Sequence, residues 1–130
     1  MQLIDNALLD EVSGKAQVCE RLRMNHNFHS NAVSPSQRLI HALEPGTELP
    51  IHRHPHTQET YILLRGRIRV LFYNSDKTLM EEVELDPLQG LFGVNIPAGQ
   101  WHTLVVLESG SAIFECKDGP YKPIGAEDLL

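Results

Sequence analysis

The sequence predicts an all-β sandwich or barrel with a short helical extension at its N-terminus. Short apolar runs follow one another from Gln37 onward, and turn residues such as Pro45-Gly46, Gly66 and Pro97-Ala98-Gly99 separate them. Short strands at close spacing are typical of antiparallel sandwiches and barrels. Helices do not alternate with the strands, which excludes a Rossmann or TIM-barrel architecture.

The predicted strands each contain a short apolar run bounded by turn residues. They are expected at Arg38–Leu43, Ile51–His54, Thr60–Arg65, Arg67–Tyr73, Leu79–Leu85, Leu91–Ile96, Thr103–Leu107 and Ala112–Cys116. A chain of 130 residues is expected to form one hydrophobic core. We therefore predict an N-terminal extension over 1–36, a β-barrel domain over 37–117, and a C-terminal tail over 118–130. Prolines are expected to hold the first part of this tail, Asp118–Pro123, extended.

The first twenty residues carry apolar side chains at helical spacing, and Asp5 or Asn6 is placed to cap the helix. The apolar positions are Leu8, Leu9, Val12, Ala16 and Cys19. Ser13-Gly14 weakens the middle of this pattern, so one interrupted helix or two short turns are both compatible with it.

The next segment, Arg21–His29, alternates as a strand does, with Leu22, Met24 and Phe28 on one face. This apolar face needs a surface to bury against. A monomer can fold the segment back onto its own barrel, and two chains can pair or exchange it. We predict a homodimer.

The charge balance excludes several classes of partner. Eleven Lys and Arg against seventeen Asp and Glu give a net charge of −6. This argues against nucleic acid or an anionic membrane, which both call for basic patches. No run approaches the length of a membrane span, and no signal peptide is recognisable. Cys19 and Cys116 form no CxxC pair. We expect a cytoplasmic protein with reduced thiols.

Three of the seven histidines lie within Ile51–His56, and two of them have the spacing of metal ligands. In a strand, His52 and His54 point to the same face, about 7 Å apart along the chain. A tight turn containing Pro55 returns Glu59 to the same pocket. Two histidines and one carboxylate form a facial triad with open positions for a ligand.

His102 is the fourth candidate ligand. It follows the turn at Pro97–Gly99 and opens a new strand, from which it can reach into a barrel from the opposite sheet. Imidazole suits zinc, copper, iron and nickel, and the carboxylate adds manganese. We expect one divalent transition metal ion per chain: Fe, Mn, Zn, Ni or Co.

These residues resemble the two sequence motifs of the cupin superfamily. Gly46, His52, His54, Glu59 and Gly66 stand as G-x5-H-x-H-x4-E-x6-G, and residues 97–102 stand as P-x-G-x-x-H. The resemblance covers about residues 37–117. It implies a jelly-roll barrel whose metal ligands are His52, His54, Glu59 and His102. Leu91 and Val106 depart from the second motif, in place of a glycine and an asparagine, and neither departure affects a ligand.

The chain as a whole is similar to the WbuC family of small cupin metalloproteins. The similar segments are Arg23–His29, His52–Thr60 and Gly119–Tyr121. Members of that family occur in bacterial gene clusters for O-antigen and other surface polysaccharides. The resemblance implies a pathway context and not a reaction.

Four further residues are candidates for the substrate pocket. His41 lies in an apolar strand, either as a core group or beside the pocket as an acid or base. His56 shares the parity of His52 and His54, and it either replaces one of them as a ligand or lies at the rim of the pocket. Tyr61 shares the face of Glu59 and either fills the barrel or binds substrate. Arg69, like Arg67, lies on a solvated face unless it points inward to bind an anion.

Three functions fit these features. The first is a metal-dependent isomerase or epimerase acting on a sugar or sugar nucleotide, with the metal as Lewis acid. The second is an iron-dependent dioxygenase, and the third is a non-catalytic module that binds a metal and a small polar metabolite. The fold does not decide among them, and the sequence identifies no catalytic residue.

Overall fold

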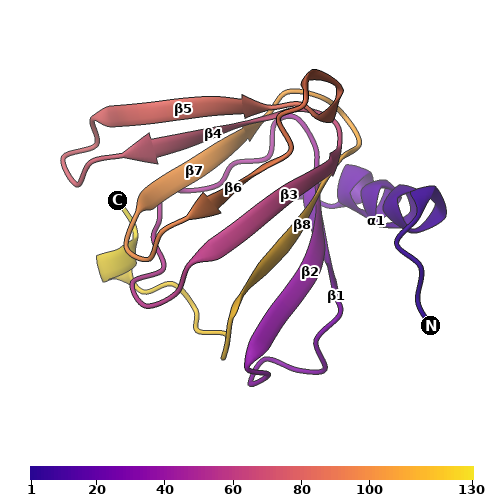
Figure 1. Cartoon of the computed structure of the whole chain (residues 1–130), viewed down its shortest axis with the longest axis horizontal. Coiled ribbons are helices and arrows are strands. Elements are labelled where there is room, and N and C mark those ends of the chain that lie inside the picture. Colours follow the sequence, from indigo (N-terminus) through magenta and orange to yellow (C-terminus); the bar gives the residue numbers. More distant parts are fainter.

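The computed structural model describes all 130 residues and shows one helix beside two antiparallel sheets (Figure 1). In chain order the elements are α1 (Asn6–Val18), β1 (Arg23–Asn27), β2 (Ser36–Leu43), β3 (Glu59–Arg65), β4 (Ile68–Tyr73), β5 (Leu79–Leu85), a 3-10 helix at Pro87–Gln89, β6 (Gly93–Ile96), β7 (Trp101–Val106), β8 (Ser111–Asp118) and a 3-10 helix at Ala126–Asp128. The predicted all-β character is confirmed.

The two sheets face each other but do not close into a barrel. The larger sheet has the strand order β1-β2-β8-β3-β6, and the smaller has the order β5-β4-β7. No ladder of hydrogen bonds joins β6 to β7, so the expected closed jelly-roll barrel is corrected to an open two-sheet structure. The chain passes from one sheet to the other at Gly66, where φ is +94° and a Cβ atom would lie 2.1 Å from Ser111 Oγ. Only glycine fits this turn.

The main core lies between the two sheets. Along β4, Ile68 and Val70 are buried while the residues between and beyond them are partly exposed, which is the alternation expected of a strand with one buried face. The core residues are Leu43, Tyr61, Leu63, Ile68, Val70, Leu85, Ile96, Leu104, Val106 and Ile113.

Helix α1 is continuous and covers the outer face of the larger sheet. The Asp5 side chain accepts a hydrogen bond from the Leu8 N–H and caps the helix. Ser13-Gly14 does not interrupt it, because Ser13 is buried and its Oγ accepts a hydrogen bond from Arg65 Nη2 at 3.1 Å. The helix is too short and too polar to cross a membrane.

Strand β1 pairs with β2 of its own chain, with Asn25 opposite His41. Met24 packs against Val12 and Ala16 of α1. The apolar face of the predicted strand is therefore covered within the chain and needs no second copy. The homodimer stays a prediction, but this segment no longer supports it.

The predicted strand at Ile51–His54 is not formed. The segment is extended, but it makes only isolated bridges, from His52 to His102 and from His52 to Leu129. Pro50 and Pro55 bracket it, and proline has no N–H to continue a ladder.

Beyond Pro123 the C-terminal tail turns back onto the segment at 51–53. The Arg53 N–H donates to the Asp128 carbonyl at 3.1 Å, and the Leu130 N–H donates to the Ile51 carbonyl at 2.9 Å. The tail therefore supports the segment that carries two of the candidate metal ligands.

Candidate metal centre

The structure brings together the four residues that the sequence predicts as metal ligands. Each of His52, His54, Glu59 and His102 offers one ligand atom, and these atoms all lie within 4.8 Å of one another. Glu59 begins β3 in the larger sheet, and His102 lies at the start of β7 in the smaller sheet. The two sheets thus contribute opposite sides of one cluster.

Glu59 is the centre of this cluster. Its carboxylate lies 3.3 Å from His54 Nε2 through Oε1, and 3.1 Å from His102 Nε2 through Oε2. Both Glu59 and His102 are only 2% exposed. A carboxylate so deeply buried needs a positive partner or hydrogen-bond donors, because desolvation of the charge is costly.

Backbone carbonyls fix the tautomers of two of the histidines. His52 Nδ1 donates to the Pro50 carbonyl at 2.9 Å, and His102 Nδ1 donates to the Gln100 carbonyl at 2.8 Å. In a neutral ring this leaves Nε2 with a lone pair, as in a metal-ligating histidine oriented by a second hydrogen bond.

The arrangement of the four donor groups fits a bound metal ion. The lone pair of His102 Nε2 faces a carboxylate oxygen of Glu59, and two such atoms repel each other unless a cation or an additional proton lies between them. Three imidazoles and one carboxylate suit a divalent transition metal, and the donor set is compatible with several such metals.

The environment shifts the ionisation of the ligands. Burial raises the pKa of Glu59, but the neighbouring Glu115, His102 and His54 side chains outweigh this effect and hold the pKa of Glu59 well below its usual range. Burial and the neighbouring His102 lower the pKa of His52 to about 4. A carboxylate and a neutral imidazole are the forms that bind metal.

Glu115 is a functional candidate that the sequence analysis missed. It lies on β8 opposite Tyr61, and burial together with the neighbouring Glu59 raises its pKa well above the usual range. Its position two residues after the buried Ile113 was a detectable signal, because alternate residues of a strand share a face.

Tyr61 and His41 lie beside these carboxyl groups. Tyr61 is 4% exposed and donates to Glu59 Oε2 at 3.3 Å, while burial and the charge of Glu59 raise its pKa. His41 Nδ1 lies 3.8 Å from Glu115 Oε2. Burial and the charge of Arg23 lower the pKa of His41 to about 4, so His41 is neutral at pH 7 and its contact with Glu115 is not an ion pair.

A hollow of about 430 Å³, which we call the inner pocket, opens onto the cluster. His52, His54 and Glu59 line it, together with His41 and Tyr61. Its remaining walls include Asn25 and Asn27 of β1, Leu104, Glu115, Lys117 and Lys122. The polar side of β1 is therefore a wall of the pocket.

Two of the predicted pocket residues lie elsewhere. His56 is exposed in the turn after Pro55 and is not part of the ligand cluster. Arg69 lies between Ile68 and Val70, whose side chains are buried, and its own side chain alternates to the opposite face of β4. It lines neither the inner pocket nor the hollow beside it.

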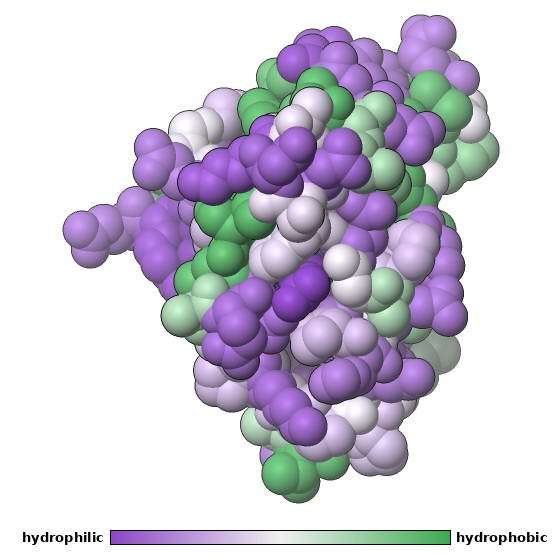
Figure 2. Space-filling view, turned by 90° about the vertical axis from the view of Figure 1, so that its left-hand side faces the viewer, coloured by the Kyte–Doolittle hydropathy of each residue, from purple (hydrophilic) through white to green (hydrophobic).

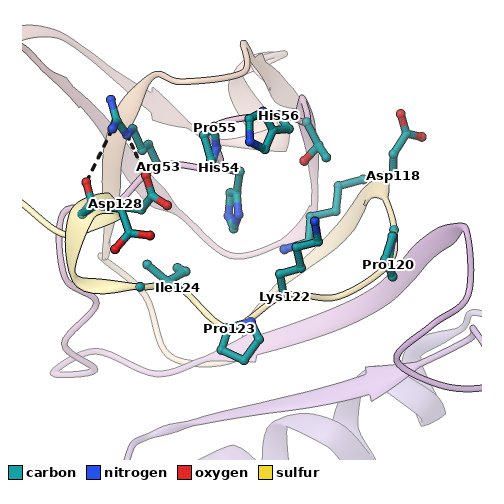
Figure 3. Close-up of a pocket in the computed structure, with 15 residues that line it drawn as sticks. Arg53, His54, Pro55, His56, Asp118, Pro120, Lys122, Pro123, Ile124 and Asp128 are labelled. Carbon is teal, nitrogen blue, oxygen red and sulfur yellow. Dashed lines mark hydrogen bonds and ion pairs between the residues drawn. The ribbon is translucent and has the colours of Figure 1, made fainter.

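A second hollow of about 750 Å³, the outer groove, lies between the turn at 53–57 and the tail at 117–128 (Figure 3). Arg53 crosses one end of it. The Arg53 guanidinium lies 4.4 Å from the centre of the Trp101 ring, and its Nε donates to Asp128 Oδ1 at 2.9 Å. We call this contact between the turn and the tail the Arg53 clasp.

Solved structures share this fold at low sequence identity. The capsular polysaccharide assembling protein CapF from Staphylococcus aureus has a TM-score of 0.66 at 19% identity over 82% of this chain. KdgF from Halomonas sp. has 0.61 at 16% identity over 81% of this chain and 85% of its own. The cupin domain of Cnp3 from Schizosaccharomyces pombe has 0.56 at 13% identity over 76% of this chain and 66% of its own. The fold is therefore cupin-like.

The chain spans only 28% of the length of CapF. No curated protein matches it. A family model matches residues 4–85, which include α1 and the ligands His52, His54 and Glu59. The chain belongs to this family, whose description is Domain of unknown function (DUF6016).

Proposed function

We propose that this chain is a metal-dependent enzyme of the isomerase or epimerase type. Its substrate is a sugar or sugar nucleotide used in bacterial surface polysaccharide, such as O-antigen. The observation that carries the proposal is the convergence of His52, His54, Glu59 and His102 beside a pocket with other ionisable groups. A metal ion held by these four residues supplies Lewis-acid chemistry to a substrate oxygen.

The residues of the pocket have the properties that such a reaction needs. The amides of Asn25 and Asn27 can donate to and accept from sugar hydroxyl groups. His41 lines the pocket, and burial and the charge of Arg23 lower its pKa to about 4, so its ring is neutral at pH 7 and can exchange hydrogen bonds with a substrate hydroxyl group. Tyr61 holds the Glu59 carboxylate in place through its hydroxyl.

The biological setting rests on resemblance. The name of CapF refers to capsular polysaccharide assembly, and CapF shares the fold. The segments Arg23–His29 and His52–Thr60 resemble those of WbuC-like proteins. Both point to surface polysaccharide, and both leave the reaction open.

Elemental analysis after anaerobic purification tests the metal centre. We expect about one divalent transition metal ion per chain in the wild type, and a large loss in His52→Ala and in His102→Ala. His56→Ala is the matched control, because it removes an exposed histidine from the same turn. Full metal content in both ligand variants would overturn the assignment, and loss in His56→Ala would make His56 a ligand.

Turnover distinguishes the candidate reactions. An iron-dependent dioxygenase is the second candidate, because His52, His54 and Glu59 form the two-histidine, one-carboxylate set that suits iron(II). Iron together with oxygen uptake in the presence of a sugar nucleotide would favour it. Product without oxygen uptake favours the isomerase, and tight binding without product favours a binding module.

A further inference from the structure

Two lysines lie between the inner pocket and the outer groove, and neither is paired. Lys117 and Lys122 line both hollows, together with His54 and Ile124. The ion pairs formed by lysine and arginine side chains in this structure involve other residues, and no carboxylate lies within 4.0 Å of the ammonium group of Lys117 or Lys122. In a chain with a net charge of −6, two unpaired ammonium groups at one opening are a distinct electrostatic feature.

The larger sheet directs Lys117 into the site. It ends the run Ile113, Glu115, Lys117 on β8, in which alternate residues face the second sheet. Lys117 is also the direct partner of Glu59 in the β3–β8 register, and opposite residues of an antiparallel pair share a face. Its ammonium group therefore lies on the side of the sheet that carries the ligand cluster.

The tail holds Lys122 on the other side of the opening. The Gly119 N–H donates to the Pro35 carbonyl at 2.9 Å and the Tyr121 N–H donates to the Ala32 carbonyl at 2.7 Å. These bonds anchor the chain just before Lys122. Figure 3 shows Lys122 extending into the outer groove on the side of His54, while the carboxylate of Asp118 points away.

Three carboxylates line the outer groove together with the lysines, and none of them lies within 4.0 Å of either ammonium group; they belong to Asp118, Glu127 and Asp128. Asp128 is engaged by Arg53, and Glu127 lies beside Gly125 on the tail. The exposed His56 adds a further hydrogen-bond donor or acceptor at the same rim. Figure 2 shows the side of the molecule where the C-terminal 3-10 helix lies, and hydrophilic residues cover most of it. The opening thus suits a hydrophilic anion.

We propose that Lys117 and Lys122 bind the phosphate group of a phosphorylated sugar whose sugar ring occupies the inner pocket. The proposal rests on the proposed function, because it takes the metal centre as the place where the sugar binds. A dianionic phosphate matches two ammonium groups, and lysine binds phosphate as a point charge. The lysines thereby take the role in anion binding that the sequence analysis offered to Arg69.

Calorimetric titration with three probes tests the proposal. Glucose 1-phosphate, glucuronate and glucose share a pyranose ring but carry a phosphate, a carboxylate and no charge. We expect glucose 1-phosphate to bind the metal-loaded protein most tightly, and its affinity to fall as sodium chloride is raised. Equal binding of glucuronate would overturn the phosphate assignment, and so would binding of no probe.

Variants of the two lysines test whether their ammonium groups bind the phosphate. We expect the double variant Lys117→Gln/Lys122→Gln to bind glucose 1-phosphate at least about tenfold more weakly, since hydrogen bonds to charged groups are that strong. Glucose binding should not change. Lys15→Gln on α1 is the matched control for net charge, and Lys117→Arg/Lys122→Arg should restore most of the affinity. An unchanged affinity in the glutamine variant, or an equal loss in Lys15→Gln, overturns the lysine site.

Metal content measured on the same samples separates the two proposals. A metal-loaded wild type that binds glucose 1-phosphate no better than glucose overturns the lysine site and leaves the metal centre in place. A wild type that binds no metal overturns the metal centre. The lysine site is then judged by whether the glutamine variant still lowers glucose 1-phosphate binding in the metal-free protein.

Discussion

Removing the Asp128 carboxylate is expected to weaken metal binding from outside the ligand cluster. In Asp128→Ala the Arg53 clasp loses its hydrogen bond of 2.9 Å, and the Arg53 side chain keeps its contact with Trp101 and a hydrogen bond of 3.5 Å from Nη2 to the Glu127 carbonyl. Arg53 stands between His52 and His54 in the chain. A change in the position of Arg53 is therefore expected to move the backbone of both candidate ligands.

The size of the effect on stability follows from burial. The Asp128 side chain is 12% exposed and that of Arg53 is 34% exposed. A fully exposed pair contributes less than about 1 kcal/mol, and a hydrogen bond to a charged group contributes about 1.5 to 3 kcal/mol when it is shielded from water. We expect Asp128→Ala to lower the free energy of unfolding by about 1 to 2 kcal/mol, which for a chain of this length is roughly 3 to 8 °C in Tm.

The effect on metal affinity is expected to be separate from the effect on stability. Groups that orient metal ligands typically change affinity by about 10- to 100-fold when they are removed. We expect at least a tenfold loss in Asp128→Ala, measured by competition with a chelator of known affinity under conditions where the variant is fully folded.

Glu127→Ala is the matched control for this experiment. It removes a neighbouring exposed carboxylate but keeps the Glu127 carbonyl, which accepts from Arg53 Nη2 at 3.5 Å. A double-mutant cycle with Arg53→Ala measures the coupling within the clasp. If Asp128→Ala bound metal as tightly as Glu127→Ala, the tail would not support the ligand segment, and the reasoning would be refuted.

Three other expectations follow. Chelation should lower Tm in a thermal melt, because metal at a hundred times its Kd stabilises the fold by about 2.7 kcal/mol; an unchanged Tm after verified metal removal would contradict a site formed by the fold. In the metal-free protein, His41 has its pKa lowered from 6.5 to about 4. The unfolded chain therefore binds more protons between those values, and stability should fall as pH falls from about 6.5 to 4, by up to about 3 kcal/mol for this group. Urea melts of His41→Gln should show a weaker dependence, and an unchanged slope would exclude His41. Light scattering at micromolar concentration should give twice the 14.7 kDa chain mass, and a monomer mass would reject the dimer.

Local patterns predicted most of the strands and the ligand cluster. The run Leu79–Leu85 forms β5 with the predicted bounds, because the alternation and the flanking turn residues specify both ends. The four ligand atoms converge because Pro55 begins a turn that returns Glu59 toward His54, and the turn at Pro97–Gly99 starts β7 with His102 facing inward.

Features that depend on distant residues were not predictable in the same way. The segment Ile51–His54 has the composition of a strand, but it makes only isolated bridges, one of them to Leu129 in the tail. The tail's return depends on Arg53 and Asp128, which are 75 residues apart. Alternation alone left the inward or outward direction of Arg69 undecided, and packing of Ile68 and Val70 in the core settled it.

The metal centre lies where two sheets meet without hydrogen bonds between their ladders. Glu59 belongs to the larger sheet, His102 belongs to the smaller, and His52 pairs with His102 through N–H to carbonyl bonds of 3.0 and 2.9 Å. A cation coordinated by these residues would join the sheets at this open edge, where otherwise a buried carboxylate faces imidazole lone pairs. Such an ion would therefore also hold the two sheets together. This is why we expect metal binding and stability of the fold to be strongly linked.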